Sequence, residues 1–108
     1  RGASVLVFES GSQPLRKVRI SGGGRCNVMH DPRTWDPSRA SELLRSRYPR
    51  GSRGLLGPLA DRFSPVDTAA WFEDAGVPLR CEPDGRVFPT ENDSSAVIDA
   101  LLWSAREA

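Results

Sequence analysis

The sequence predicts an α/β fold, because a strand-like run, several helical patterns and a hairpin turn follow one another along its 108 residues. The run from Ala3 to Phe8 is short, apolar and rich in branched residues, which is typical of a strand buried on both faces of a parallel sheet. No stretch approaches the ~20 apolar residues that a membrane span needs. We therefore expect no membrane partner.

The strand-like run ends in the carboxylate of Glu9. In a dinucleotide-binding βαβ unit, the acidic residue that closes the second strand accepts hydrogen bonds from the ribose hydroxyls, roughly 20 residues after a Gly-x-Gly-x-x-Gly turn. This chain opens at Arg1-Gly2 and lacks that turn. We therefore expect the first strand, the turn and most of the first helix to precede residue 1, so that the chain is a fragment, from the second strand onward, of a Rossmann-like nucleotide-binding domain.

Three consecutive glycines are followed by a cation and an amide. Glycine has no Cβ, so its backbone can take positive φ and turn several N–H groups toward an anion. Arg25 adds donors suited to phosphate, and Asn27 can donate and accept toward a heterocycle. A flexible surface turn is the alternative. The predicted cofactor-binding residues are Glu9, Ser21, Gly22, Gly23, Gly24, Arg25, Cys26 and Asn27.

Helical patterns recur after the glycines. We expect helices from Asp36-Pro37 to Pro49, from Leu55 to about Arg62, from Ser64 to Gly76, and from Asp93 or Ser94 onward. A basic loop over Arg50–Gly54 separates the first two, and the spacing of Ser64 and Asp67 is typical of a capping box.

A small hairpin is expected between the last two helices. The segments Val77–Glu82 and Arg86–Pro89 flank the turn signal Pro83-Asp84-Gly85. Because proline cannot donate to a strand ladder, Pro78 confines the first arm to the edge of its sheet.

The net charge is only +1, but the middle of the chain is basic. Arginines near an aromatic can bind phosphates and stack on bases, so Arg45, Arg47, Arg50 and Arg53 with Tyr48 leave an Arg-rich nucleic-acid-binding module as one alternative. We favour a solvated helix end and loop, where arginines complement the helix dipole.

Cys26 and Cys81 are 55 positions apart and His30 is the single histidine, so cysteine and histidine alone do not assemble a set of three or four metal ligands, and we predict no metal site. The sequence leaves a disulfide between Cys26 and Cys81 open, and we favour free thiols. Cys26 lies beside Arg25, which could activate its thiol, but we favour a small apolar residue packed under the loop. His30 is expected to be a polar loop residue, with an acid–base role as the alternative.

Two motifs together resemble one family. The box Gly22-Gly23-Gly24-Arg25-Cys26-Asn27 and the later Gly85-Arg86-Val87-Phe88-Pro89, preceded by Phe72 to Gly76, are similar to the signatures of aminoacetone-oxidase-like and 3-dehydro-bile-acid-reductase-like FAD-dependent oxidoreductases. Nearly the whole chain is covered. The chain departs from the family at Met29-His30, where Thr-Asn is usual, and at Leu15, where a glycine often precedes the Arg-Lys pair.

The resemblance implies part of an FAD domain that continues beyond these residues with an inserted second domain and a C-terminal return. It implies that Glu9 holds the adenosine ribose, that the glycine backbone and Arg25 line the path from pyrophosphate to flavin, and that Cys26 and Asn27 approach the isoalloxazine. It also implies a small-molecule substrate, with NAD(P)H as a candidate electron donor. No catalytic residue is assigned.

An NAD(P)- or nucleotide-binding module without flavin redox activity is the other alternative. We expect a cytoplasmic protein, or an organellar one if a transit peptide precedes residue 1.

Overall fold

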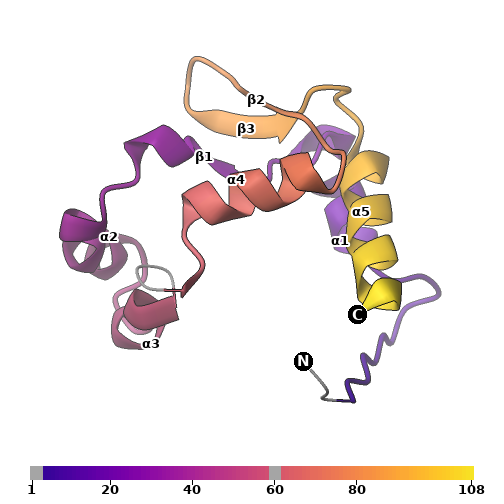
Figure 1. Cartoon of the computed structure of the whole chain (residues 1–108), viewed down its shortest axis with the longest axis horizontal. Coiled ribbons are helices and arrows are strands. Elements are labelled where there is room, and N and C mark those ends of the chain that lie inside the picture. Colours follow the sequence, from indigo (N-terminus) through magenta and orange to yellow (C-terminus); the bar gives the residue numbers. More distant parts are fainter. Residues whose placement is uncertain (1–3, 59–61) are drawn as a thin grey trace.

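The computed structural model describes residues 4–58 and 62–108, and within them it combines five α-helices with a three-stranded antiparallel sheet. Figure 1 shows helix α4 lying close to the sheet, with α5 beside both, whereas α2 and α3 lie apart on the other side. None of the helices in these two stretches is long and apolar enough to cross a membrane. The predicted α/β class is confirmed.

The predicted hairpin forms the centre of the sheet. Strand β2 (Leu79–Cys81) pairs with β3 (Arg86–Pro89), and Arg80 lies opposite Phe88. The strand order β1-β3-β2 places β2 at an edge, as Pro78 predicts. Strand β1 (Met29–His30) pairs with the other side of β3 and was not expected from the sequence.

Two helices begin at the caps that the sequence predicts. Helix α4 (Pro65–Asp74) carries a capping box, in which the Ser64 N–H donates to Asp67 Oδ2 at 2.8 Å and the Asp67 N–H donates to Ser64 Oγ at 3.2 Å. Helix α5 (Ser94–Glu107) begins after Asp93, whose Oδ1 accepts from the Ser95 N–H at 2.8 Å.

The middle of the chain is more helical than predicted. Asp36 caps a 3₁₀ turn (Pro37–Arg39) that continues into α2 (Ala40–Arg47), which confirms the predicted start. The predicted basic loop over Arg50–Gly54 is wrong in its second half, because α3 runs over Ser52–Gly57. Packing of α3 against α2 outweighs the weak helix propensity of its glycines. Residues 59–61 of the predicted second helix lie outside the described residues.

The core lies where α4, α5 and the sheet meet. Its side chains are less than a tenth exposed, and Phe88 is completely buried. They include Cys26, Phe72, Val77, Val87, Phe88, Val97 and Ile98. The short helix α1 (Arg16–Ile20) packs against α5, where the buried Ser94 Oγ donates to the Arg19 carbonyl at 2.9 Å.

The predicted buried strand near the start of the chain is not formed. Residues 4–10 are irregular, and the side chains of Val5, Leu6, Val7 and Phe8 are 75% to 91% exposed. A parallel strand needs neighbours to satisfy its backbone N–H and C=O groups. No strand of the described residues pairs with this segment, so an extended conformation would not bury its apolar side chains.

Candidate functional site

The glycine loop, Ser21–Asn27, follows directly from α1. A 3₁₀ turn over Ser21–Gly24 contains backbone of left-handed sense, with φ of +57° at Gly22, +71° at Gly23 and +86° at Gly24. Residues with a Cβ pay about 1–2 kcal/mol to adopt this conformation. The expectation that these glycines take positive φ is therefore confirmed. The Cys26 N–H donates to the Ser21 carbonyl at 3.0 Å and closes the loop.

The three glycines have different surroundings. A Cβ on Gly22 would lie 2.9 Å from the Asn27 nitrogen and 3.0 Å from Phe88 Cε1, so this glycine lets the loop pack on its own protein. A Cβ on Gly23 would meet no atom of the described residues within 4 Å, and one on Gly24 would meet only the Arg19 carbonyl at 3.9 Å. Gly23 is exposed and Gly24 is half-buried, and the open space beside their Cα atoms would let a ligand approach the backbone closely.

Arg25 is held against the hairpin. Its Nη1 donates to Glu82 Oε1 at 2.7 Å, and its guanidinium carbon lies 3.9 Å from the centre of the Phe88 ring. Both side chains of the ion pair are partly shielded, with 31% of Arg25 and 21% of Glu82 exposed. One face of the guanidinium is therefore used by the protein itself.

The end of the loop is fixed to β3. The Val28 N–H donates to the Val87 carbonyl at 2.8 Å. The side-chain amide of Asn27, with its nitrogen turned inward, donates to the carbonyls of Met29 and Val87 at 3.0 and 3.2 Å. The two motifs that carry the family resemblance are thus packed against each other.

Cys26 lies beneath the loop. Its side chain is 7% exposed and belongs to the core cluster, which confirms the expected packing role. Its backbone has φ of +59°, unusual for a residue with a side chain. Cys81 is exposed, and both thiols are free, so the disulfide left open by the sequence is not formed.

Glu9 lies away from this anchored loop, on the N-terminal segment (residues 4–14). Its Oε1 accepts from the nearby Gly11 N–H at 2.6 Å. The carboxylate lines an open hollow of about 640 Å³. The other lining residues are Ser10, Gly11, Leu15, Arg16, Lys17, Val18 and Ile20. The hollow extends from Glu9 along α1 as far as Ile20, the residue before the glycine loop, and none of the loop residues lines it.

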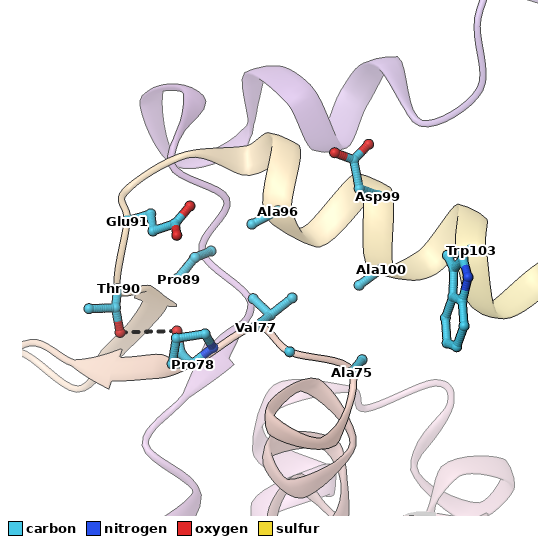
Figure 2. A pocket seen from close by; sticks show the side chains of 11 residues that line it. Ala75, Val77, Pro78, Pro89, Thr90, Glu91, Ala96, Asp99, Ala100 and Trp103 are labelled. Carbon is cyan, nitrogen blue, oxygen red and sulfur yellow. Dashed lines mark hydrogen bonds between the residues drawn. The ribbon is translucent and has the colours of Figure 1, made fainter.

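A second hollow, of about 390 Å³, lies between the start of β2, the end of β3 and α5 (Figure 2). Its floor is apolar and includes Val77 and Ala100, and its rim carries Glu91, Asp99 and the exposed Trp103. None of its lining residues is basic, and two are carboxylates, so it is unsuited to a diphosphate. The candidate cofactor site is the glycine loop with the first hollow.

Asp31 is the most strongly perturbed carboxyl near the loop. The Arg33 guanidinium donates to it at 2.7 and 2.8 Å, and these hydrogen bonds lower the pKa of Asp31 to about 2. Asp31, the residue after β1, therefore stays ionised and forms a local ion pair with Arg33. Within residues 4–58 and 62–108, no group of three or more His, Cys, Asp or Glu side chains is placed to hold a metal ion.

Four site residues were missed from the sequence. Arg16 and Lys17 line the hollow of Glu9, and Glu82 and Phe88 hold Arg25. The Arg-Lys pair and the phenylalanine both lie in segments that carry the family resemblance, which was a usable signal. Glu82 has no such signal, because its partner is 57 positions away.

Comparison with models of protein families supplies an independent finding. The family model described as HI0933-like protein Rossmann domain matches residues 1–108, the whole length of the sequence.

Proposed function

The chain belongs to the HI0933-like Rossmann-domain family of FAD-binding oxidoreductases, and from this premise we propose that its glycine loop and Glu9 bind one FAD molecule. The observation that carries the proposal is the open space beside Gly23 and Gly24, next in sequence to Arg25, together with a hollow that is lined by Glu9, Arg16 and Lys17 and ends at the residue before the loop. Backbone N–H groups and cations suit the diphosphate of FAD, and a carboxylate suits its ribose hydroxyls.

The residues present fit this cofactor by their chemistry. Glu9 would accept hydrogen bonds from the adenosine ribose, and Arg16 and Lys17 would neutralise phosphate charge. Arg25 would face the path from diphosphate to flavin, with Cys26 and Asn27 near the isoalloxazine end. When bound, FAD supplies hydride transfer, and the chain's own residues orient it and set the polarity around it.

We further propose that the protein is an aminoacetone-oxidase-like or 3-dehydro-bile-acid-reductase-like enzyme with a small-molecule substrate and NAD(P)H as electron donor. The Gly-Gly-Gly-Arg-Cys-Asn box supports this finer assignment. The exposed apolar side chains of residues 5–8 also support the proposal that this chain is part of a larger FAD-binding domain, whose other strands would cover them. A cytoplasmic or organellar location is part of the same proposal.

Flavin absorbance tests the assignment directly. Full-length protein, purified and then incubated with FAD, is expected to be yellow and to retain flavin bands after gel filtration. NADH or NADPH titrated in its place tests the nucleotide-binding alternative without flavin. Protein that stays colourless after reconstitution contradicts the proposal, and salt-dependent retention on immobilised RNA or DNA instead would favour the nucleic-acid alternative.

The role of Glu9 is tested by Glu9→Gln, which keeps the size of the side chain and removes its charge. We expect FAD affinity to fall by about tenfold, as for the loss of one charge-assisted hydrogen bond. Glu73→Gln, an exposed carboxylate on α4, is the matched control. Equal affinities for the two variants would remove Glu9 from the site.

A further inference from the structure

Glu82 lies at the centre of a cluster of arginines on the hairpin. Its carboxylate is 2.7 Å from Arg25, 3.4 Å from Arg86 and 3.6 Å from Arg80. The backbone of Glu82 is itself fixed, since its N–H donates to the Arg86 carbonyl at 2.8 Å and its carbonyl accepts from the Gly85 N–H at 2.9 Å. The carboxylate is therefore presented from a rigid turn.

The shortest of these contacts reaches the glycine loop. Arg25 is the only one of the three arginines that belongs to the loop, and its guanidinium stacks on Phe88 while it donates to Glu82. Among the described residues, the side-chain hydrogen bonds of Arg25 end at Glu82. The ring and the carboxylate together fix the plane and the position of the guanidinium.

The charge of the cluster remains suited to an anion. Arg86 is also paired with Asp84 at 2.7 Å, so the three arginines face two carboxylates. Glu82 therefore immobilises Arg25 without making this surface negative.

We propose that Glu82 is a positioning residue for FAD binding, which acts by fixing Arg25 and, through it, the shape of the glycine loop. This inference rests on the proposed function, because it assigns a role toward the cofactor of the same site. Glu82 need not touch the cofactor. Its effect on affinity is expected to pass through Arg25 alone.

The test compares Glu82→Gln with Asp84→Asn in the full-length protein. Both changes remove one carboxylate charge from the same hairpin, but only Glu82 contacts Arg25. We expect the Kd for FAD to rise about tenfold in Glu82→Gln and less than twofold in Asp84→Asn, measured by quenching of flavin fluorescence. The visible circular dichroism of flavin at saturation should change only in Glu82→Gln.

An Arg25→Ala background separates positioning from a general structural effect. There, adding Glu82→Gln should leave the Kd unchanged, because the group that Glu82 positions is gone. A further tenfold loss in that background, wild-type affinity in Glu82→Gln, or a Glu82→Gln protein that no longer folds would each overturn the inference. Wild-type protein that binds no FAD would instead overturn the proposed function.

Discussion

The glycine loop and the N-terminal segment differ in what holds them, although both are proposed to bind the same cofactor. The loop is fixed by Glu82, by the ring of Phe88 and by the Val87 carbonyl, all far away in the sequence. Glu9 accepts only a local hydrogen bond among the described residues, from Gly11. One half of the candidate site is thus built by tertiary contacts, and the other half by its own local sequence.

This difference shows that an apolar, β-branched sequence does not by itself make a strand. Val87-Phe88 and Val7-Phe8 have the same two residue types, yet the first pair is buried and the second is 88% and 91% exposed. Strand propensity reflects packing on a half-buried surface, and only β3 has partners on both edges. Substitutions should therefore have unequal effects in the two regions.

The largest effect is expected for Phe88→Ala. Phe88 is completely buried and contacts the loop through both Gly22 and Arg25. Loss of such a phenylalanine costs about 3–5 kcal/mol of unfolding free energy, which is measurable by urea denaturation. Phe8→Ala is the matched control and should change stability by less than about 0.5 kcal/mol. Equal losses in both variants would contradict the contrast between the two regions.

Gly85→Ala, in the hairpin on which the glycine loop packs, should lower the unfolding free energy nearly as much. Gly85 has φ of +84°, and a Cβ there would overlap the ring of His30. We expect a loss of about 2–3 kcal/mol, of which about 1–2 comes from the backbone conformation. Adding His30→Ala removes the overlap but not the backbone cost, so the double variant should recover only part of the loss. Full recovery would show that the conformation of Gly85 is not strained by a side chain.

The sequence was sufficient wherever a local signal determines the structure. The capping box of Ser64 and Asp67 and the Pro83-Asp84-Gly85 turn gave the start of α4 and the position of the hairpin. Within the candidate site, the glycine run predicted the positive φ angles, and the apolar character of Cys26 predicted its burial.

The rest depends on pairing between distant residues, which no local pattern encodes. Strand β1 has only two residues, and it forms because β3 offers it an edge. The Arg25–Glu82 pair likewise joins residues 57 positions apart. Ala3 of the predicted strand lies outside the described residues. Residues 4–8 are irregular for the opposite reason, since their pattern favours a strand but no strand in the described part of the chain pairs with them.

Within the glycine loop, Gly22→Ala and Gly23→Ala should separate stability from binding. Both glycines have positive φ, so each alanine costs about 1–2 kcal/mol. Only at Gly22 does the new methyl group meet the loop backbone and a buried ring, which should add about 1 kcal/mol to the loss. Gly23→Ala should instead show the greater loss of FAD affinity relative to its loss of stability. Identical unfolding curves would show that the loop does not pack on Phe88 through Gly22.

Acidification should weaken the ion pair between Asp31 and Arg33. The folded pKa of this carboxyl, about 2, is lower than its ordinary value of 3.8 because Arg33 donates hydrogen bonds to it. The ion pair therefore contributes stability above about pH 4, and this contribution is lost as the pH falls through the folded pKa. Asp31→Asn should flatten the decline in unfolding free energy between pH 4 and pH 2. An unchanged slope would show that Asp31 is not paired in solution.

The smallest effect is expected at Leu15, where the N-terminal segment meets α1. Leu15 has φ of +59°, and the resembling family often has glycine at this position, so the leucine carries conformational strain. Leu15→Gly relieves about 1–2 kcal/mol of backbone strain. Against this, glycine loses more conformational entropy on folding, and the contacts of the half-buried leucine side chain are lost. The net change in unfolding free energy should therefore be within about 0.5 kcal/mol of zero. Leu15→Ala keeps the strain and loses the same contacts, so it should be less stable than Leu15→Gly by about 1 kcal/mol. The reverse order would mean that α1 does not begin through a left-handed residue. The difference in unfolding free energy between the two variants therefore measures whether Leu15, which joins the N-terminal segment to α1, adopts the left-handed backbone conformation in solution.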